Sequence, residues 1–321
     1  MSNEIVSRRS LLYAGATLAA GSAVVPVEAR ATQQATKLKV AIFSKHLLFV
    51  QGEQLAQTAS ELGFDGIDLA VRKGGHVEPD RVKQELPELV ATIRKHGLEV
   101  PMLTTDIADT ETPYAEDILS TMKELGISHY RWGGFKYNRQ TPIEKQLDAL
   151  RPRVEKLAKL NARYRASAMY HTHSGIDLVG APIWDLHELM KGLDPEAVGV
   201  NYDVGHATVE GGFGGWIDSF RVTGLYLRGI AVKDFLWSKT ARGQWRPEWK
   251  PLGEGIVRFP EFFRMVAASG FSGPLQLHFE YPLGGSENGK KELTGSKQEV
   301  FAAMKRDLAQ LRSYLKDANL A

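Results

Sequence analysis

Residues 98–132, LEVPMLTTDIADTETPYAEDILSTMKELGISHYRW, contain a strand, a helix and a second strand in close succession. The first strand is the apolar run 98–104, and the amphipathic segment 113–125 behind it has the pattern of a helix that buries one face. Leu125-Gly126-Ile127 ends the helix, because glycine takes the left-handed conformation with which many helices end. The next strand, 128–132, follows at once, so these residues predict a βα unit of a parallel sheet.

The same alternation of strand and helix occurs eight times along the chain. The other predicted strands are 39–44, 66–71, 166–171, 198–203, 225–234 and 274–281, and the other predicted helices are 52–62, 79–96, 141–164, 181–190, 216–222, 259–269 and 298–316. Eight βα units in about 280 residues predict an α/β protein with a (β/α)8 TIM barrel as its single domain, over residues 32–321. An open doubly wound sheet is disfavoured, because no G-x-G-x-x-G motif follows the first strand.

Composition excludes several classes of protein. Of 321 residues, 43% are hydrophobic and 24% are charged, as in ordinary globular proteins. The formal net charge of +2 is too small for a protein that mainly holds nucleic acid, where a basic surface supplies most of the affinity. The chain has no cysteine, which excludes thiolate nucleophiles and cysteine-ligated metals. Any metal ion must therefore bind to His, Asp or Glu.

The N-terminus resembles an export signal. Arg8 and Arg9 precede an apolar run, 11–25, of about 15 residues, fewer than the roughly 20 of a membrane-spanning helix. Ala29-Arg30-Ala31 resembles a cleavage site, and the whole segment resembles a twin-arginine (Tat) signal peptide. We expect residues 1–31 to be removed, leaving a periplasmic protein with no stable membrane anchor. An ordinary secretory signal and an uncleaved anchor stay open.

Polar residues gather where a barrel enzyme places its active site, at the C-terminal ends of the strands. Six of nine histidines lie at or just past a predicted strand end: His46, His76, His171, His173, His206 and His278. Alternate residues of a strand face opposite sides, so the apolar residues 275, 277 and 279 turn His278 and Glu280 into the barrel. The same alternation turns Asp68 and Asp203 inward. Ionisable groups that meet inside a barrel are costly unless they are paired or bind something.

Four short motifs carry a family resemblance: DVGH at 203–206, VKD at 232–234, PLGEG at 251–255 and GPLQLH at 273–278. Together they resemble the xylose-isomerase-like TIM barrels, over residues 38–315. That superfamily includes sugar isomerases and epimerases, inosose dehydratases and endonuclease IV.

The resemblance implies a metal site. In the epimerases of the superfamily, one divalent cation, often Mn²⁺, is held by a Glu, an Asp, a His and a second Glu from the last four strands. Asp203 matches the Asp, and His206 matches a histidine that contacts substrate. His171 stands at the first Glu, Ala231 at the His and His278 at the second Glu. The resemblance therefore implies His171, Asp203 and His278 as metal ligands here.

Two histidines and one carboxylate suit Mn²⁺, Fe²⁺ or Zn²⁺ better than Mg²⁺, and we expect Mn²⁺. His206 and Lys233 are expected to orient and polarise the sugar, and His173 or Glu280 to move the proton. A role for Glu280 as a fourth metal ligand or as a partner of the ligands stays open. Contacts to substrate are expected from five more: His46, Asp68, His76, Arg131 and Trp237.

These residues predict a metal-dependent isomerase or epimerase, or a related lyase, that acts on a keto-sugar, an aldose or a polyol. It would abstract a proton next to a carbonyl and stabilise an enediolate. The alternative is a non-catalytic periplasmic carbohydrate-binding barrel with a degenerate metal site, because residues 171, 231 and 278 depart from the family pattern. A nuclease is disfavoured by the near-neutral charge and the missing carboxylates. The expected partner is a small sugar and no nucleic acid, and a homodimer stays open.

Overall fold

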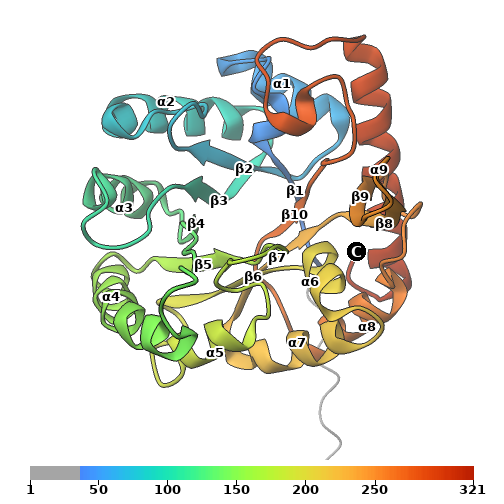
Figure 1. Ribbon diagram of the computed structural model, residues 1–321. Coiled ribbons are helices and arrows are strands. Elements are labelled where there is room, and N and C mark those ends of the chain that lie inside the picture. The colour runs from blue at the N-terminus through green and yellow to red at the C-terminus, as the bar shows by residue number, and fades with distance from the viewer. Residues whose placement is uncertain (1–36) are drawn as a thin grey trace, which may run out of the picture. The chain divides into compact units, whose positions relative to one another are not determined.

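Eight parallel strands close into a barrel in the computed structural model, which describes residues 37–321 (Figure 1). The strands, in their order around the ring, are β1 (Val40–Phe43), β10 (Leu275–Leu277), β7 (Leu227–Val232), β6 (Val198–Asp203), β5 (Ser167–His171), β4 (His129–Trp132), β3 (Glu99–Thr105) and β2 (Gly66–Val71). The ring closes where β1 pairs with β10, as in the register of Val40 with Leu275. The predicted TIM barrel is therefore confirmed.

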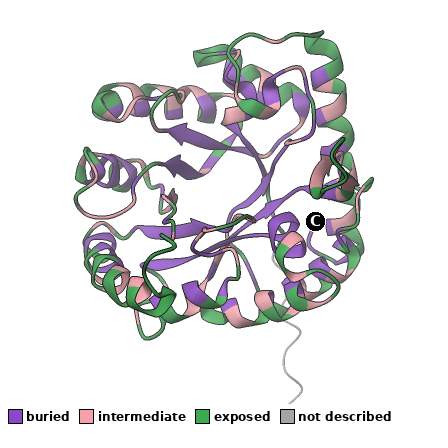
Figure 2. Cartoon of the chain, viewed as in Figure 1, coloured by how far each residue is buried: buried purple, intermediate pink, exposed green. Residues whose placement is uncertain are grey.

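Helices surround the strands. They are α1 (Gly52–Leu62), α2 (Val82–Lys95), α3 (Ala115–Leu125), α4 (Ile143–Tyr164), α5 (Trp184–Met190), α6 (Val204–Gly211), α7 (Gly215–Thr223), α8 (Phe259–Ser269) and α9 (Lys297–Asp317), with 3-10 turns η1 (Ser44–Leu47), η2 (Pro79–Arg81), η3 (Gly224–Tyr226) and η4 (Ser286–Asn288). Their apolar faces lie on the barrel, while their outer faces are exposed (Figure 2). Among the helices of residues 37–321, none is both long enough and apolar enough to span a membrane.

The glycine turn in the opening stretch has the expected geometry. Gly126 has a φ of 70°, and its N–H donates to the carbonyls of Lys123 and Met122. Such a left-handed residue ends α3 and turns the chain into β4. The predicted signal peptide, residues 1–31, lies outside the described residues.

The predicted seventh strand, 225–234, differs from the structure. Barrel strand β7 (Leu227–Val232) ends two residues before the predicted end, and the chain then leaves the barrel as a hairpin of β8 (Asp234–Lys239) and β9 (Trp245–Lys250), for which no strands were predicted beyond residue 234. The Asp234 carboxylate causes the departure, because it accepts hydrogen bonds from the backbone N–H groups of Phe235, Gly253, Gly255 and Val257. These bonds hold the PLGEG segment, 251–255, against the start of the hairpin.

Two further elements differ from the sequence prediction. Residues 204–211 form helix α6, because the Asp203 side chain accepts the His206 N–H at 2.9 Å and caps the helix. Strand β10 stops at Leu277, before the predicted end at 281. The next N–H group toward β1, that of Phe279, donates to the imidazole of His46 instead of to the sheet.

Candidate active site

Three side chains from three barrel strands converge inside the C-terminal mouth of the barrel: His171 at the end of β5, Asp203 at the end of β6 and His278 just past β10. Their potential ligand atoms lie within 4.8 Å of one another. The rings of His171 and His278 are stacked, with centroids 5.2 Å apart, and His171 Nε2 lies 3.4 Å from Asp203 Oδ2. All three side chains are buried. Ala231, paired with Asp203 in the sheet, adds no ligand atom.

These three residues hold polar atoms without a hydrogen-bond partner among residues 37–321: His171 Nε2, Asp203 Oδ2 and His278 Nε2. Lys233 Nζ lies 3.2 Å from Asp203 Oδ2, an ion-pair distance without hydrogen-bond geometry. Burial is the main cause that lowers the pKa of both imidazoles well below the ordinary value, so both are neutral near pH 7. Buried unpaired polar atoms are costly, and neutral imidazole with carboxylate is a typical donor set for a divalent ion. The residues therefore fit such an ion.

A buried amide pair supports His171 from inside the barrel. Asn201 Nδ2 lies 3.0 Å from His171 Nδ1 and 2.8 Å from Gln276 Oε1. Both amides can rotate by 180° together and keep their mutual hydrogen bond, which places Asn201 Oδ1 against a protonated Nδ1. The proton on Nδ1 leaves Nε2 free to ligate a metal ion. Gly229 makes room for this pair, because a Cβ there would lie 2.7 Å from Asn201 Oδ1.

Lys233 is the central cation of the mouth. Its Nζ lies 3.0 Å from Glu280 Oε2 and donates to His206 Nε2 at 2.6 Å. The indole of Trp249 covers it, with the ring centroid 4.5 Å from Nζ. Burial alone would raise the pKa of Glu280, but Lys233 and then Lys45 hold that pKa well below its ordinary value. Glu280 is therefore an ionised partner of Lys233 near neutral pH.

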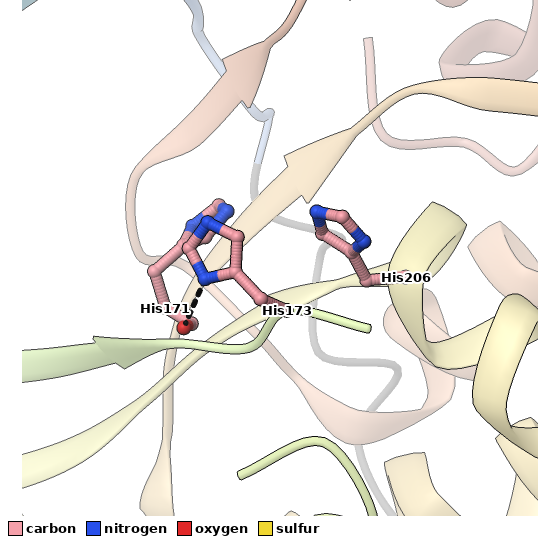
Figure 3. A group of neighbouring side chains, drawn as sticks. All are labelled: His171, His173 and His206. Atoms are coloured by element: carbon pink, nitrogen blue, oxygen red, sulfur yellow. Dashed lines mark hydrogen bonds between the residues drawn. The ribbon is translucent and has the colours of Figure 1, made fainter. Parts of the chain in front are cut away.

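His206 has both ring nitrogens engaged. Since Nε2 accepts from Lys233, Nδ1 carries the proton and donates to Ser174 Oγ at 2.8 Å. Figure 3 shows His206 beside His171 and His173, and the three offer a second set of ligand atoms within 4.8 Å. This second set suits a metal less well than the first, because His206 has no free nitrogen. Its geometry instead suits orientation of Lys233.

His173 has one free ring nitrogen. Its Nδ1 donates to the His171 carbonyl at 3.1 Å, which leaves Nε2 as an acceptor (Figure 3). Burial first, then Arg131 and Lys233, lowers the pKa of His173 to about 4. His173 and Arg131 line a cavity of about 310 Å³ at the ends of β4 and β5. A neutral imidazole at such a cavity is placed to accept a proton from a ligand.

Two of the residues predicted to contact substrate, Asp68 and His46, have hydrogen-bond partners within the protein. Asp68 is buried and accepts the Thr104 hydroxyl at 2.8 Å, and burial raises its pKa to about 7. His46 uses both nitrogens on backbone, since Nδ1 donates to the Ser286 carbonyl and Nε2 accepts from Phe279. These contacts give His46 a role in holding the β10 loop.

His76 and Trp237 lie apart from the metal-ligand set. His76 Nε2 donates to the Val50 carbonyl at 3.1 Å, beside the loop after β2. Trp237 is 42% exposed on the hairpin and packs edge-on against Phe235. Trp249 is the hairpin indole that reaches the mouth. The sequence alone does not tell which tryptophan of this segment faces the mouth, because that depends on how β8 pairs with β9.

Comparison with known proteins places the chain in a family. The model of the xylose isomerase-like TIM barrel matches residues 56–306. The chain belongs to this family. No curated protein matches the sequence.

Several solved structures share the fold at low identity. D-Psicose 3-epimerase with D-tagatose from Clostridium cellulolyticum H10 has 14% identity and a TM-score of 0.61, covering 87% of this chain and 99% of that one. The probable 3-DHS dehydratase AsbF from Bacillus anthracis has 17% identity and a TM-score of 0.62, covering 86% and 99%. The IOLI protein with a bound zinc atom has 14% identity and a TM-score of 0.66, covering 86% and 98%. These likenesses extend over nearly the whole of each structure and show the fold.

Proposed function

We propose that this xylose isomerase-like barrel is a metal-dependent isomerase or epimerase, or a related lyase, acting on a sugar. The observation that carries the proposal is the convergence of His171 Nε2, Asp203 Oδ2 and His278 Nε2, three buried atoms without hydrogen-bond partners among residues 37–321. The names of the similar structures, two of which are a sugar epimerase and a zinc-bound protein, support it. We also propose that residues 1–31 direct export to the periplasm.

A divalent ion held by these three atoms, with Mn²⁺ as our choice, supplies Lewis-acid stabilisation of negative charge on substrate oxygens. His171 and His278 bring neutral nitrogens to it, and Asp203 brings the charge that balances part of the ion. Asn201 fixes the ring of His171, so the donor nitrogen keeps its direction.

Proton transfer is assigned to His173. Its Nδ1 is held by the His171 carbonyl, so Nε2 points its lone pair away from that bond and accepts the proton next to the substrate carbonyl. Lys233, charged and held between Glu280 and His206, donates hydrogen bonds to the oxygen where charge develops. Return of the proton from His173 to the neighbouring carbon on the same face, with transfer of that carbon's hydroxyl proton to the former carbonyl oxygen, would give isomerisation. Epimerisation would need a second group to donate a proton to the opposite face.

Metal content tests the first half of the proposal. Elemental analysis of the purified protein should find about one Mn, Fe or Zn per chain, and His278→Ala should lose it. His96→Ala is the matched control, because His96 is the C-cap residue of α2, lies 3.5 Å from Glu53 and belongs to neither candidate group of metal ligands. Absence of metal from the unmodified protein, with none regained on adding Mn²⁺, would refute the metalloenzyme.

Exchange of substrate protons tests the second half. Incubation of keto-sugars in D₂O should give deuterium at the carbon next to the carbonyl, and His173→Gln should abolish this exchange while keeping the metal.

A non-catalytic carbohydrate-binding barrel is the second candidate. It is favoured by the Lys233 ammonium, which lies 3.2 Å from Asp203 Oδ2 and already neutralises part of the donor set. In that case sugars would bind to the metal-free protein, and no keto-sugar would exchange its protons.

A further inference from the structure

Three cations at the barrel mouth have neither a carboxylate nor a hydrogen-bond partner among residues 37–321. Lys45 follows β1, Arg72 follows β2 and Arg131 lies on β4. Within the described part of the chain, none of their side chains has a carboxylate within 4.0 Å or makes a hydrogen bond. Arg153, by contrast, binds Asp109 and Arg228 binds Glu196. Other cations of residues 37–321 also have no partner, such as Arg165, Arg242 and Arg264, but they are exposed to water, whereas Lys45, Arg72 and Arg131 are half-buried.

These cations adjoin the proposed metal ligands through one aromatic ring. The Lys45 ammonium lies 5.8 Å and the Arg72 guanidinium 5.4 Å from the centroid of Phe43. That ring lies 5.1 Å from the His278 ring. Arg131 lies near enough for its charge to act on Lys45 and for the charge of Arg72 to act on it, and it lines the cavity of about 310 Å³ with His173.

The nearby carboxylates are already engaged. Asp203 and Glu280 share the Lys233 ammonium, and Asp68 accepts the Thr104 hydroxyl. Asp106, whose charge also acts on Arg131, is exposed to water.

Burial first, with neighbouring cations, lowers the pKa of Lys45 to about 8 although Glu280 acts to raise it. Burial and then Arg72 lower the pKa of Arg131 to about 10 although Asp68 and Glu280 act to raise it. Partly buried charges of one sign are costly when nothing opposes them, and an anionic ligand would remove this cost.

We propose that the substrate is an anionic sugar, whose carboxylate or phosphate binds among Lys45, Arg72 and Arg131. This rests on the proposed function, since it places the charged end of the substrate on the β1–β4 side of the mouth and the reacting carbon near His173. Two guanidinium groups can grip such an oxyanion through paired N–H donors. A neutral sugar of the same size would leave all three cations unpaired.

Calorimetric binding of three probes tests the inference: 2-keto-D-gluconate for a carboxylate, D-fructose 6-phosphate for a phosphate and D-fructose for neither. At least one anionic probe should bind more than about 10-fold tighter than D-fructose, because charge-assisted hydrogen bonds are the strong ones. The anionic probe that binds tighter shows whether the site prefers a carboxylate or a phosphate. The advantage should shrink as salt is raised.

Variants locate the anion. Arg72→Gln and Lys45→Gln should each reduce the advantage of the anionic probe about 10-fold and leave binding of D-fructose unchanged. Arg221→Gln is the matched control, because Arg221 is an exposed arginine on α7 that pairs with Asp218. Thermal unfolding of each variant shows whether it is folded. If one of the two variants is not folded, the other still tests the inference by itself.

Equal binding of all three probes would overturn the inference, as would an anionic advantage that survives in both variants. Failure of the proposed function is a separate result, because it is decided by metal content and by proton exchange. A metal-loaded protein that exchanges D-fructose protons and shows no preference for anions would refute this inference alone. A metal-free protein that keeps the preference for anions would refute the enzyme alone.

Discussion

Replacing Asn201 with leucine, alone and together with Gln276, separates the effect of this amide pair on metal binding from its effect on the stability of the barrel. The side chain is fully buried and makes two contacts, to His171 Nδ1 at 3.0 Å and to Gln276 at 2.8 Å. Leucine has nearly the same shape and can make neither contact. Asn201→Leu therefore leaves one imidazole nitrogen and one buried amide without partners.

The expected cost follows from these two orphaned groups. Each buried polar group that loses its partner costs about 1–3 kcal/mol, so Asn201→Leu should lower the free energy of unfolding by about 2–6 kcal/mol. The ring of His171 also loses its orienting partner, which should weaken metal binding by about 10–100-fold. The double variant Asn201→Leu/Gln276→Leu removes the orphaned amide too. It should recover roughly half of the lost stability and none of the metal affinity.

Urea denaturation measures the free energy of unfolding on metal-free protein, and competition with a chelator measures metal affinity. Asn161→Leu is a matched control, because Asn161 is equally buried but binds the Tyr130 hydroxyl and the Ala197 carbonyl, away from the metal ligands. It should lose stability and keep metal affinity. The reasoning would be refuted by a double variant that regains metal affinity, or by an Asn201→Leu protein as stable as the parent.

Three other changes have expected outcomes. Gly229→Ala should destabilise the fold by about 1–3 kcal/mol in urea, because its Cβ would lie 2.7 Å from Asn201 and 2.8 Å from the Met169 sulfur; an unchanged midpoint would contradict this. Asp234→Asn should speed proteolysis at residues 251–257, since the backbone N–H groups that now donate to the carboxylate would face an amide nitrogen, which cannot accept. Equal cleavage rates would count against Asp234 as the residue that holds this segment. His76 has a pKa of about 4 when folded against 6.5 ordinarily, so the unfolded chain binds more protons at this histidine between these values. The contribution of His76 to stability is full above pH 6.5 and falls by at most about 3 kcal/mol as the pH drops to 4, in addition to the contributions of His129 and His173, whose pKa is lowered in the same way. His76→Gln should flatten that pH dependence of the free energy of unfolding, and an unaltered slope would exclude His76 as its cause.

The sequence by itself determined the barrel and the direction of its inner side chains. Strand alternation is local, so the apolar residues of strand β10 and its continuation decide that Gln276 and His278 face inward. The contact of Gln276 with Asn201 inside the barrel agrees with that alternation. The glycine that ends a helix is also a local signal, as Gly63, Gly126 and Gly270 show after α1, α3 and α8. Fold class and the strand-end position of the histidines follow from such short-range patterns.

The tertiary structure alone decided which of these inward groups meet. His171 and His278 are stacked although 107 positions separate their sequence numbers, because ring closure between β1 and β10 fixes the lateral order of strands. His46 looked like a substrate contact at a strand end, yet the loop after β10 supplies partners for both of its nitrogens. The hairpin that aims Trp249 at Lys233 depends on a carboxylate and N–H groups about 20 residues apart. Contacts of this kind depend on closure of the whole barrel, and no local periodicity of the chain encodes them.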